Sequence, residues 1–161
     1  LLGATCSVYL AHAARYNSDR TDYVAPHTWD AVRFTPSKTR ILNALLDAIE
    51  QEAFSDSTLA VIPEGALVNI WTRRPSSLRY ISLMPAETII FTPEKITQSL
   101  LDNAPDFILI NGIAGINEYG KSRLSSYLPH LSELILANYH DITPVRIDPE
   151  EFLLLKRVNA R

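Results

Sequence analysis

The sequence predicts an α/β fold: a three-layer-like sandwich with flanking helices, a mixed and mostly parallel sheet, and a C-terminal β-hairpin. Two near-identical stretches, FTPSK at 34–38 and FTPEK at 91–95, support this prediction. Each is followed by a helical pattern and then by a short apolar run, Leu59–Ile62 or Phe107–Ile110. This order indicates βαβ units, which are parallel and right-handed. Two alternating segments around a turn at 148–151 predict the hairpin, and therefore a mixed sheet.

The individual elements follow from capping signals and apolar spacing. Thr35-Pro36 and Thr92-Pro93 each supply an N-cap and a first-turn proline. Helices are expected at residues 36–53, 65–74, 93–103 and 122–139. Central parallel strands are expected at 31–34, 59–62 and 107–110, further short strands at 78–83 and 88–91, and hairpin strands at 143–147 and 152–158.

The chain divides into a short N-terminal part and one α/β domain, residues 31–161. Residues 1–14 are apolar and almost uncharged, but a membrane span needs ~20 residues. We therefore interpret residues 1–16 as the tail of a membrane helix or as an N-terminal helix docked on the domain, and the polar residues 17–30 as a linker. Because the first residue is Leu1, we expect an excised or processed piece of a longer protein.

Charge and cysteine content exclude several classes of function. A net charge of −3 gives no electrostatic reason to expect a nucleic-acid partner. The single Cys6 excludes a disulfide framework and a cysteine-based metal site. The four histidines lack the spacing that places two metal ligands on one helix face. No metal, cofactor or catalytic set of nucleophile and base is expected.

The segment from Thr58 to Pro75 is the centre of the predicted fold. It reads as a buried strand, a loop containing Glu64, and a helix that ends in Arg73 and Arg74. The two arginines are candidates for binding an anion, although cations also stabilise a helix C-terminus. Glu64 is a candidate binding residue, although a carboxylate at this position also caps a helix.

Ligands of open α/β sheets bind beyond the carboxyl ends of the parallel strands. The loops that follow the two central strands carry Glu64, Asn111, Glu118 and Tyr119. Two carboxylates, an amide and a phenol suit a hydroxyl-rich ligand, because together they donate and accept hydrogen bonds. The alternative is that the glutamates cap backbone N–H groups and hold the two loops together.

Residues 115–122, GINEYGKS, match the phosphate-binding pattern G-x-x-x-x-G-K-S. Three observations argue against such a loop. The first glycine does not follow the strand directly, Glu118 would place a negative charge among phosphates, and little chain remains for a magnesium-binding Asp. Because the pattern itself matches, a free-standing nucleotide-binding protein that uses residues 115–122 is kept as an alternative, although these observations make it the less favoured one.

Several spaced motifs resemble a known family. They are VIPEGALVN at 61–69, RRP at 73–75, Met84-Pro85 with Glu87, Pro105-Asp106, and EYG at 118–120. In this order they resemble the C-terminal extracytoplasmic region of bacterial membrane glycosyltransferases similar to dolichyl-phosphate-mannose–protein mannosyltransferases (glycosyltransferase family 39, GT-C type). The chain departs from that pattern with two serines at 76–77 and Lys-Ser at 121–122.

The resemblance implies a parent enzyme that transfers a sugar from a polyprenyl-phosphate donor to an acceptor. The catalytic carboxylate of that family lies in an early loop between membrane helices, so no catalytic residue is assigned to this chain. The resemblance implies a non-catalytic accessory domain, anchored through the membrane-embedded part of the same chain and located on the periplasmic or extracellular side. Its further partner would be the polyprenyl-linked sugar or a glycan acceptor. A plain interaction domain is the remaining alternative.

Overall fold

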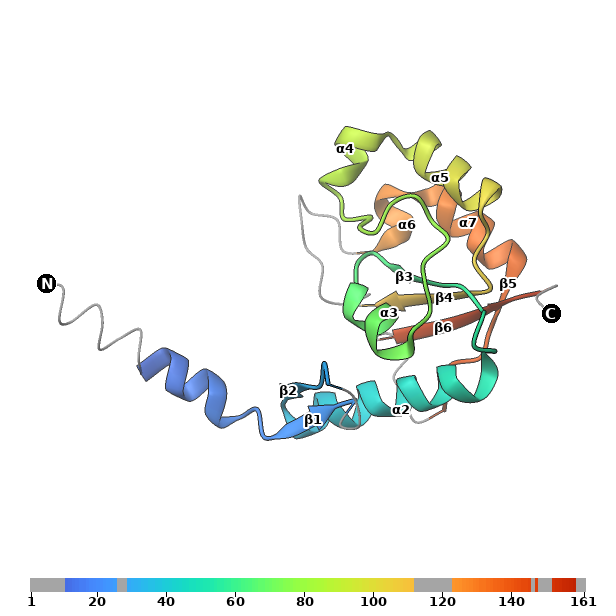
Figure 1. Ribbon diagram of the computed structural model, residues 1–161. Helices are drawn as coiled ribbons and strands as arrows, with labels where there is room; N and C mark the ends of the chain where they lie inside the picture. Colours follow the sequence, from blue (N-terminus) through green and yellow to red (C-terminus); the bar gives the residue numbers. More distant parts are fainter. Residues whose placement is uncertain (1–10, 26–28, 112–122, 146, 148–151, 159–161) are drawn as a thin grey trace, which may run out of the picture.

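The computed structural model describes residues 11–25, 29–111, 123–145, 147 and 152–158. Its elements confirm the predicted α/β class (Figure 1). The helices are α2 (Pro36–Glu52), α3 (Ala66–Thr72), α4 (Glu87–Phe91), α5 (Pro93–Asp102), α6 (Leu124–Tyr127) and α7 (Pro129–Asn138). The strands are β1 (Asp22–Val24), β2 (Val32–Phe34), β3 (Leu59–Ile62), β4 (Phe107–Asn111), β5 (Tyr139–Asp141) and β6 (Phe152–Arg157).

The main sheet has the strand order β3-β4-β6-β5. Strands β3 and β4 are parallel, with Leu59 opposite Phe107. Strand β6 pairs antiparallel with β4 and with β5, so the predicted mixed sheet and C-terminal hairpin are confirmed. Within the described part of this sheet β3–β4 is the one parallel pair, so parallel pairing does not predominate as expected.

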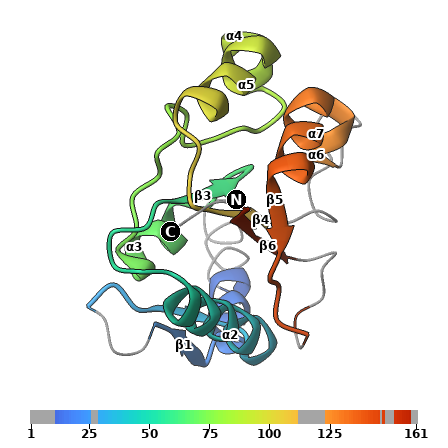
Figure 2. The same cartoon turned by 90° about the vertical axis from the view of Figure 1, so that its right-hand side faces the viewer.

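Helices cover both faces of this sheet, as expected for three layers (Figures 1 and 2). Alternate side chains of β3 and β4, such as Leu59 and Phe107, pack with α2 and α3 in one core. Their neighbours in sequence, such as Ala60 and Ile108, pack with α5, α6 and α7 in a second core. The residues of β3 and residues 107–110 of β4 are all apolar, as is typical of strands with both faces covered.

The expectation of a central β3 was wrong, because this strand lies at the edge of the sheet. Its free side is closed by irregular chain and one side chain. The Leu59 N–H donates to the Pro75 carbonyl (3.0 Å), and the Asn69 amide donates to the Leu59 carbonyl (2.6 Å). All four residues of β3 are buried. An apolar run therefore revealed burial, but it did not reveal what covers the strand.

The strand predicted at 31–34 exists, but it does not belong to the main sheet as expected. Strand β2 forms there, but it pairs antiparallel with β1 in a separate two-stranded sheet. Strand β1 lies inside the segment 17–30, which was interpreted as a linker. Residues 11–18 are helical, mostly exposed, and extend away from the body of the domain (Figure 1). Among the described residues, no helix has the length and apolar character needed to cross a membrane.

Four further elements differ from the prediction. Residues 88–91 belong to helix α4, and residues 78–83 form no strand. The helix expected at 122–139 is divided into α6 and α7 at Leu128, because the residue before Pro129 is disfavoured in the helical region. The hairpin uses β5 instead of residues 143–147. At residue 143, the Thr143 hydroxyl accepts a hydrogen bond from the Leu154 N–H (2.8 Å), so a side chain takes the place of a backbone acceptor beside β6.

Candidate functional site

The carboxyl ends of β3 and β4 bring two of the predicted binding residues together. Ile62 lies opposite Ile110, so the loop after β3 starts beside the end of β4. The Asn111 amide donates a hydrogen bond to the Glu64 backbone carbonyl (3.2 Å). Glu118 and Tyr119, the other two predicted members, lie outside the described residues.

Gly65 permits the tight turn at this edge. A Cβ atom at residue 65 would overlap Val61 Cγ1, so a larger residue cannot fit without a shift of the loop. The Glu64 side chain points into solvent, and its carboxylate has no partner among the residues that the structure describes. This edge therefore presents a carboxylate and an amide that remain accessible to a ligand.

Arg73 ends helix α3 in a left-handed conformation (φ 56°) and is about half exposed, at 54%. Its guanidinium lies 3.4 Å from an Asp30 carboxylate oxygen and 5.8 Å from the centre of the Trp29 ring. Arg73 remains accessible to an anion, although Asp30 already offsets its charge.

Arg74 has a different environment. Its side chain is 3% exposed. The guanidinium donates to the carbonyls of Ala53 (2.7 Å) and Thr72 (2.8 Å) and forms an ion pair with Glu50 (3.0 Å). These contacts join the end of α2 to the end of α3. The hypothesis of anion binding does not extend to Arg74, because its guanidinium is inaccessible to solvent.

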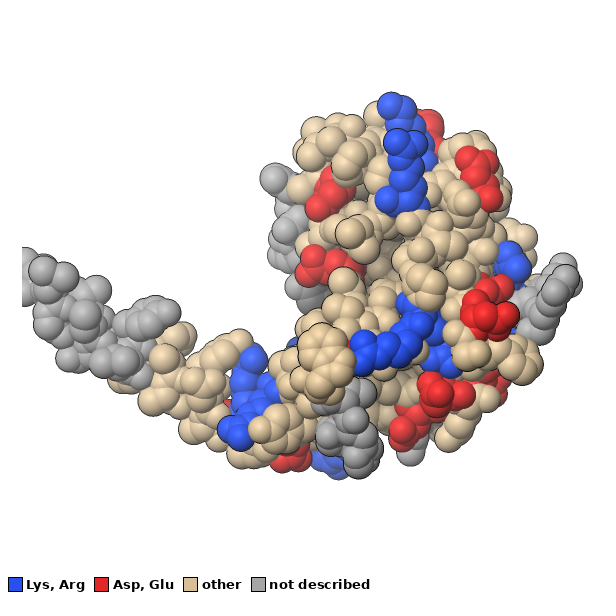
Figure 3. All heavy atoms as spheres, in the orientation of Figure 1, with Lys and Arg blue, Asp and Glu red and all other residues tan. Residues whose placement is uncertain are grey.

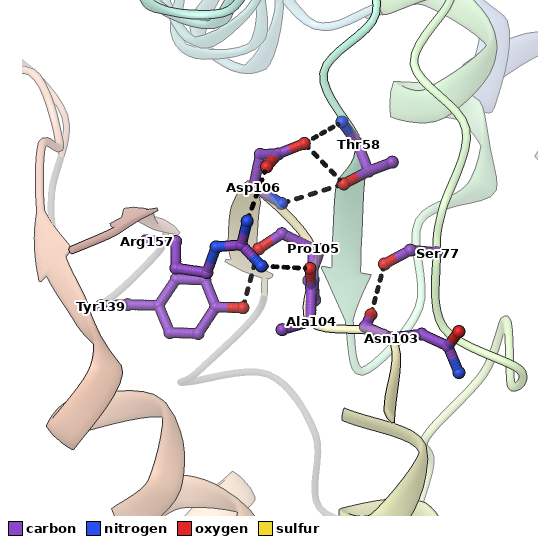
Figure 4. A network of polar contacts seen from close by, with 8 residues as sticks. All are labelled: Thr58, Ser77, Asn103, Ala104, Pro105, Asp106, Tyr139 and Arg157. Carbon is purple, nitrogen blue, oxygen red and sulfur yellow. Dashed lines mark hydrogen bonds and ion pairs between the residues drawn. The ribbon is translucent and has the colours of Figure 1, made fainter. Parts of the chain in front are cut away.

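The opposite end of the β3–β4 pair contains a polar network that the sequence analysis missed (Figure 4). One Asp106 carboxylate oxygen accepts from the Thr58 N–H (2.8 Å) and from the Thr58 hydroxyl (2.9 Å). The Asp106 N–H donates to the Thr58 hydroxyl oxygen (2.9 Å). Asp106 also pairs with the Arg157 guanidinium (3.3 Å). Thr58 and Asp106 each precede a strand by one residue, which is the sequence signal that could have identified the pair.

Tyr139 and Arg157 extend this network toward β5 and β6. Arg157 donates to the Ala104 carbonyl (2.9 Å), and the Tyr139 hydroxyl donates to the Pro105 carbonyl (2.8 Å). Burial raises the pKa of Tyr139 from 10.0 to about 12. Asp106 also raises this pKa, whereas Arg157 lowers it. The phenol is therefore protonated at neutral pH and acts as a hydrogen-bond donor.

A groove of about 550 Å³ lies beside Tyr139 and Arg157, between α5 and α7. Leu100, Leu101, Leu134 and Ala137 supply apolar parts of its wall. The Tyr139 hydroxyl and the Arg157 guanidinium lie at the end of this groove. Both are already bonded to backbone carbonyls, and Arg157 also pairs with Asp106, so these groups stabilise the fold. The carboxyl edge at Glu64 and Asn111 therefore remains the better candidate for ligand binding.

Within the described ranges, no group of three or more His, Cys, Asp and Glu side chains is placed to hold a metal ion. Comparison of the chain with models of protein families and with curated proteins finds no match.

Proposed function

We propose that this chain is a non-catalytic accessory domain of an integral-membrane glycosyltransferase. The parent enzyme would transfer a sugar from a polyprenyl-phosphate donor to an acceptor on the extracytoplasmic side of the membrane. The domain would contribute its Glu64–Asn111 edge to the entrance for the acceptor, while the chemistry takes place in the membrane-embedded part.

The sequence pattern around β3 is the observation that carries this proposal. The pattern VIPEGALVN is followed by RRP, Met-Pro and Glu-Tyr-Gly, an order that resembles the pattern of those enzymes. The geometry gives these residues different tasks. Asn69 and Arg74 are used in packing, whereas Glu64 is exposed beside Asn111. Packing alone does not require a carboxylate at residue 64, which supports a role for it in contact with a hydroxyl-rich molecule.

Transfer by the complete gene product in membranes tests the proposal. Glu64→Gln should lower transfer from a polyprenyl-phosphate-linked sugar several-fold while the melting temperature stays unchanged. Glu133→Gln is a matched control, because its carboxylate is 77% exposed and lies on α7. Equal activity of the two variants would contradict a role for Glu64 at the acceptor entrance. A complete gene without sequences for membrane helices would overturn the whole proposal.

The alternative of a nucleotide-binding protein predicts a different result. The chain of residues 1–161 alone should show neither sugar transfer nor hydrolysis of ATP or GTP. Hydrolysis that disappears in Lys121→Ala would contradict the accessory-domain proposal and favour the nucleotide alternative.

A further inference from the structure

The N-terminal part of the chain forms a distinct surface unit, here termed the N-terminal module and defined as residues 11–25 and 29–40. It contains the helix of residues 11–18, the β1–β2 ribbon and the start of α2. Hydrogen bonds from the Thr39 hydroxyl to the Asp22 carbonyl (3.3 Å) and from the Asn43 amide to the Tyr23 carbonyl (3.2 Å) attach the ribbon to α2. The ribbon therefore has a fixed position relative to the domain.

The module is basic, although the chain as a whole has a net charge of −3. Residues 11–40 contain five basic and three acidic side chains. The basic ones are Arg15, Arg20, Arg33, Lys38 and Arg40; the acidic ones are Asp19, Asp22 and Asp30. All five except the partly buried Arg20 are exposed. Figure 3 shows Lys and Arg atoms at the base of the N-terminal helix, and Asp and Glu atoms near the end of α2.

Helix stability does not explain two of these charges. Lys38 and Arg40 lie near the start of α2, which has no acidic residue in its first turn. Cations are unfavourable at a helix N-terminus, where the dipole is positive. An anionic partner would explain their location, because it offsets both the side-chain charges and the dipole.

Exposed aromatic rings accompany the arginines of this surface. The Arg20 guanidinium lies 3.7 Å from the centre of the Tyr16 ring. The Arg33 guanidinium lies 5.0 Å from the Tyr23 ring, and its Nε donates to the Tyr23 hydroxyl (2.8 Å). Arg73, adjacent to the module, lies against Trp29. The residues Tyr16, Tyr23 and Trp29 are 55%, 43% and 87% exposed, respectively.

Tyr and Trp are enriched where a bilayer meets water, because each ring has an apolar body and a polar atom. Arginine beside them interacts with lipid phosphate, and several cations together attract an anionic membrane surface. We propose that the N-terminal module binds the headgroup layer of a bilayer that contains anionic phospholipids. The apolar residues 1–14 overlap the start of this module in sequence, which favours a bilayer over another anionic partner. The inference does not require transferase activity.

The test uses the chain of residues 1–161 and vesicles of two compositions, phosphatidylcholine alone or mixed with phosphatidylglycerol. The chain contains two tryptophans. Trp71 is 7% exposed and Trp29 is 87% exposed, so a blue shift of the emission reports the transfer of Trp29 into a less polar environment. We expect cosedimentation and a blue shift with the mixed vesicles, both weakened by added salt. The blue shift should be absent in Trp29→Phe.

Charge-matched variants locate the binding surface. Arg15→Gln with Lys38→Gln removes two exposed charges from the module, and should weaken partitioning onto mixed vesicles by about 25-fold. Arg79→Gln with Lys95→Gln removes two exposed charges outside the module and should change partitioning much less. Thermal melting of each variant confirms that the fold is intact.

Three results would overturn the proposal. Equal binding to both kinds of vesicle would show that apolar residues act alone, without the module's charge. Equal weakening in the two double variants would show that the overall charge of the chain decides binding. Binding to a single-stranded oligonucleotide without binding to mixed vesicles would assign the surface to nucleic acid.

Discussion

The two ends of the parallel pair β3–β4 differ in how their polar groups are used. At the amino end, Asp106 accepts from the Thr58 N–H and hydroxyl and also pairs with Arg157. At the carboxyl end, the Asn111 side chain forms one hydrogen bond among the described residues, and the Glu64 carboxylate is exposed. The amino end therefore contributes stability, whereas the carboxyl end retains groups that can bind a ligand. This division agrees with the general location of ligands in α/β sheets.

The largest effect is expected from Asp106→Ala. The change removes the acceptor of two Thr58 donors and leaves the Arg157 charge without its partner. The free energy of unfolding should fall by about 3 kcal/mol, measured by urea denaturation. Asp102→Ala is the control, because Asp102 is exposed and accepts one hydrogen bond from Gln98. Similar losses in the two variants would contradict a special role for the amino end.

Gly65→Ala should cost about 2 kcal/mol, because the new methyl group would overlap Val61 Cγ1. A double-mutant cycle with Val61→Ala tests this cause directly. The second change removes the overlapping atom, so the double variant should be more stable than the two separate losses predict. Additive losses would show that the loop itself, and not this contact, restricts residue 65.

Tyr139→Phe should cost about 1 kcal/mol at neutral pH, because the Pro105 carbonyl loses its donor. The folded pKa of about 12 lies above the ordinary 10.0. The unfolded chain therefore releases this proton first, and the associated stability is complete below pH 10 and is lost as the pH rises toward 12. The difference between the wild type and Tyr139→Phe should decrease over this range in denaturant titrations. The exposed Tyr16 is the control, and Tyr16→Phe should change the free energy of unfolding at neutral pH much less than Tyr139→Phe.

The smallest effects are expected at the carboxyl end. Asn111→Ala should lower the free energy of unfolding by about 0.5–1 kcal/mol, since one hydrogen bond is lost. Glu64→Gln should change it by less than about 0.5 kcal/mol, as at other exposed positions. Calorimetric melting of both variants measures these effects. A clear loss of stability in Glu64→Gln would favour the interpretation of this residue as a cap.

Local signals were sufficient for much of the fold. The Thr-Pro starts and apolar spacing located α2 and α5 within one residue at each end. The buried apolar runs located β3 and β4, and their expected parallel pairing is confirmed. The meeting of Glu64 and Asn111 followed from that pairing. Their role in binding stays a prediction.

Tertiary contacts determined the remaining features. The run at 88–91 is rich in β-branched residues, yet it forms α4, whose Phe91 ring packs 4.7 Å from Tyr80. Its isoleucines 89 and 90 are exposed, which a pattern for a buried strand does not anticipate. Strand order also depends on contacts between distant residues, as in the Asn69 and Pro75 contacts that close the edge of β3.

The sequence by itself determined the α/β class, helices α2 and α5 and the residues of the parallel pair, because capping and apolar periodicity act over a few neighbouring positions. Only the tertiary structure decided that β3 is an edge strand, that β2 belongs to a separate ribbon, and that Arg74 is buried while Arg73 is exposed. Adjacent arginines carry the same local signal. Their environments differ because the end of α2 supplies carbonyl and carboxylate acceptors to one of them, and residues more than twenty positions apart set that difference.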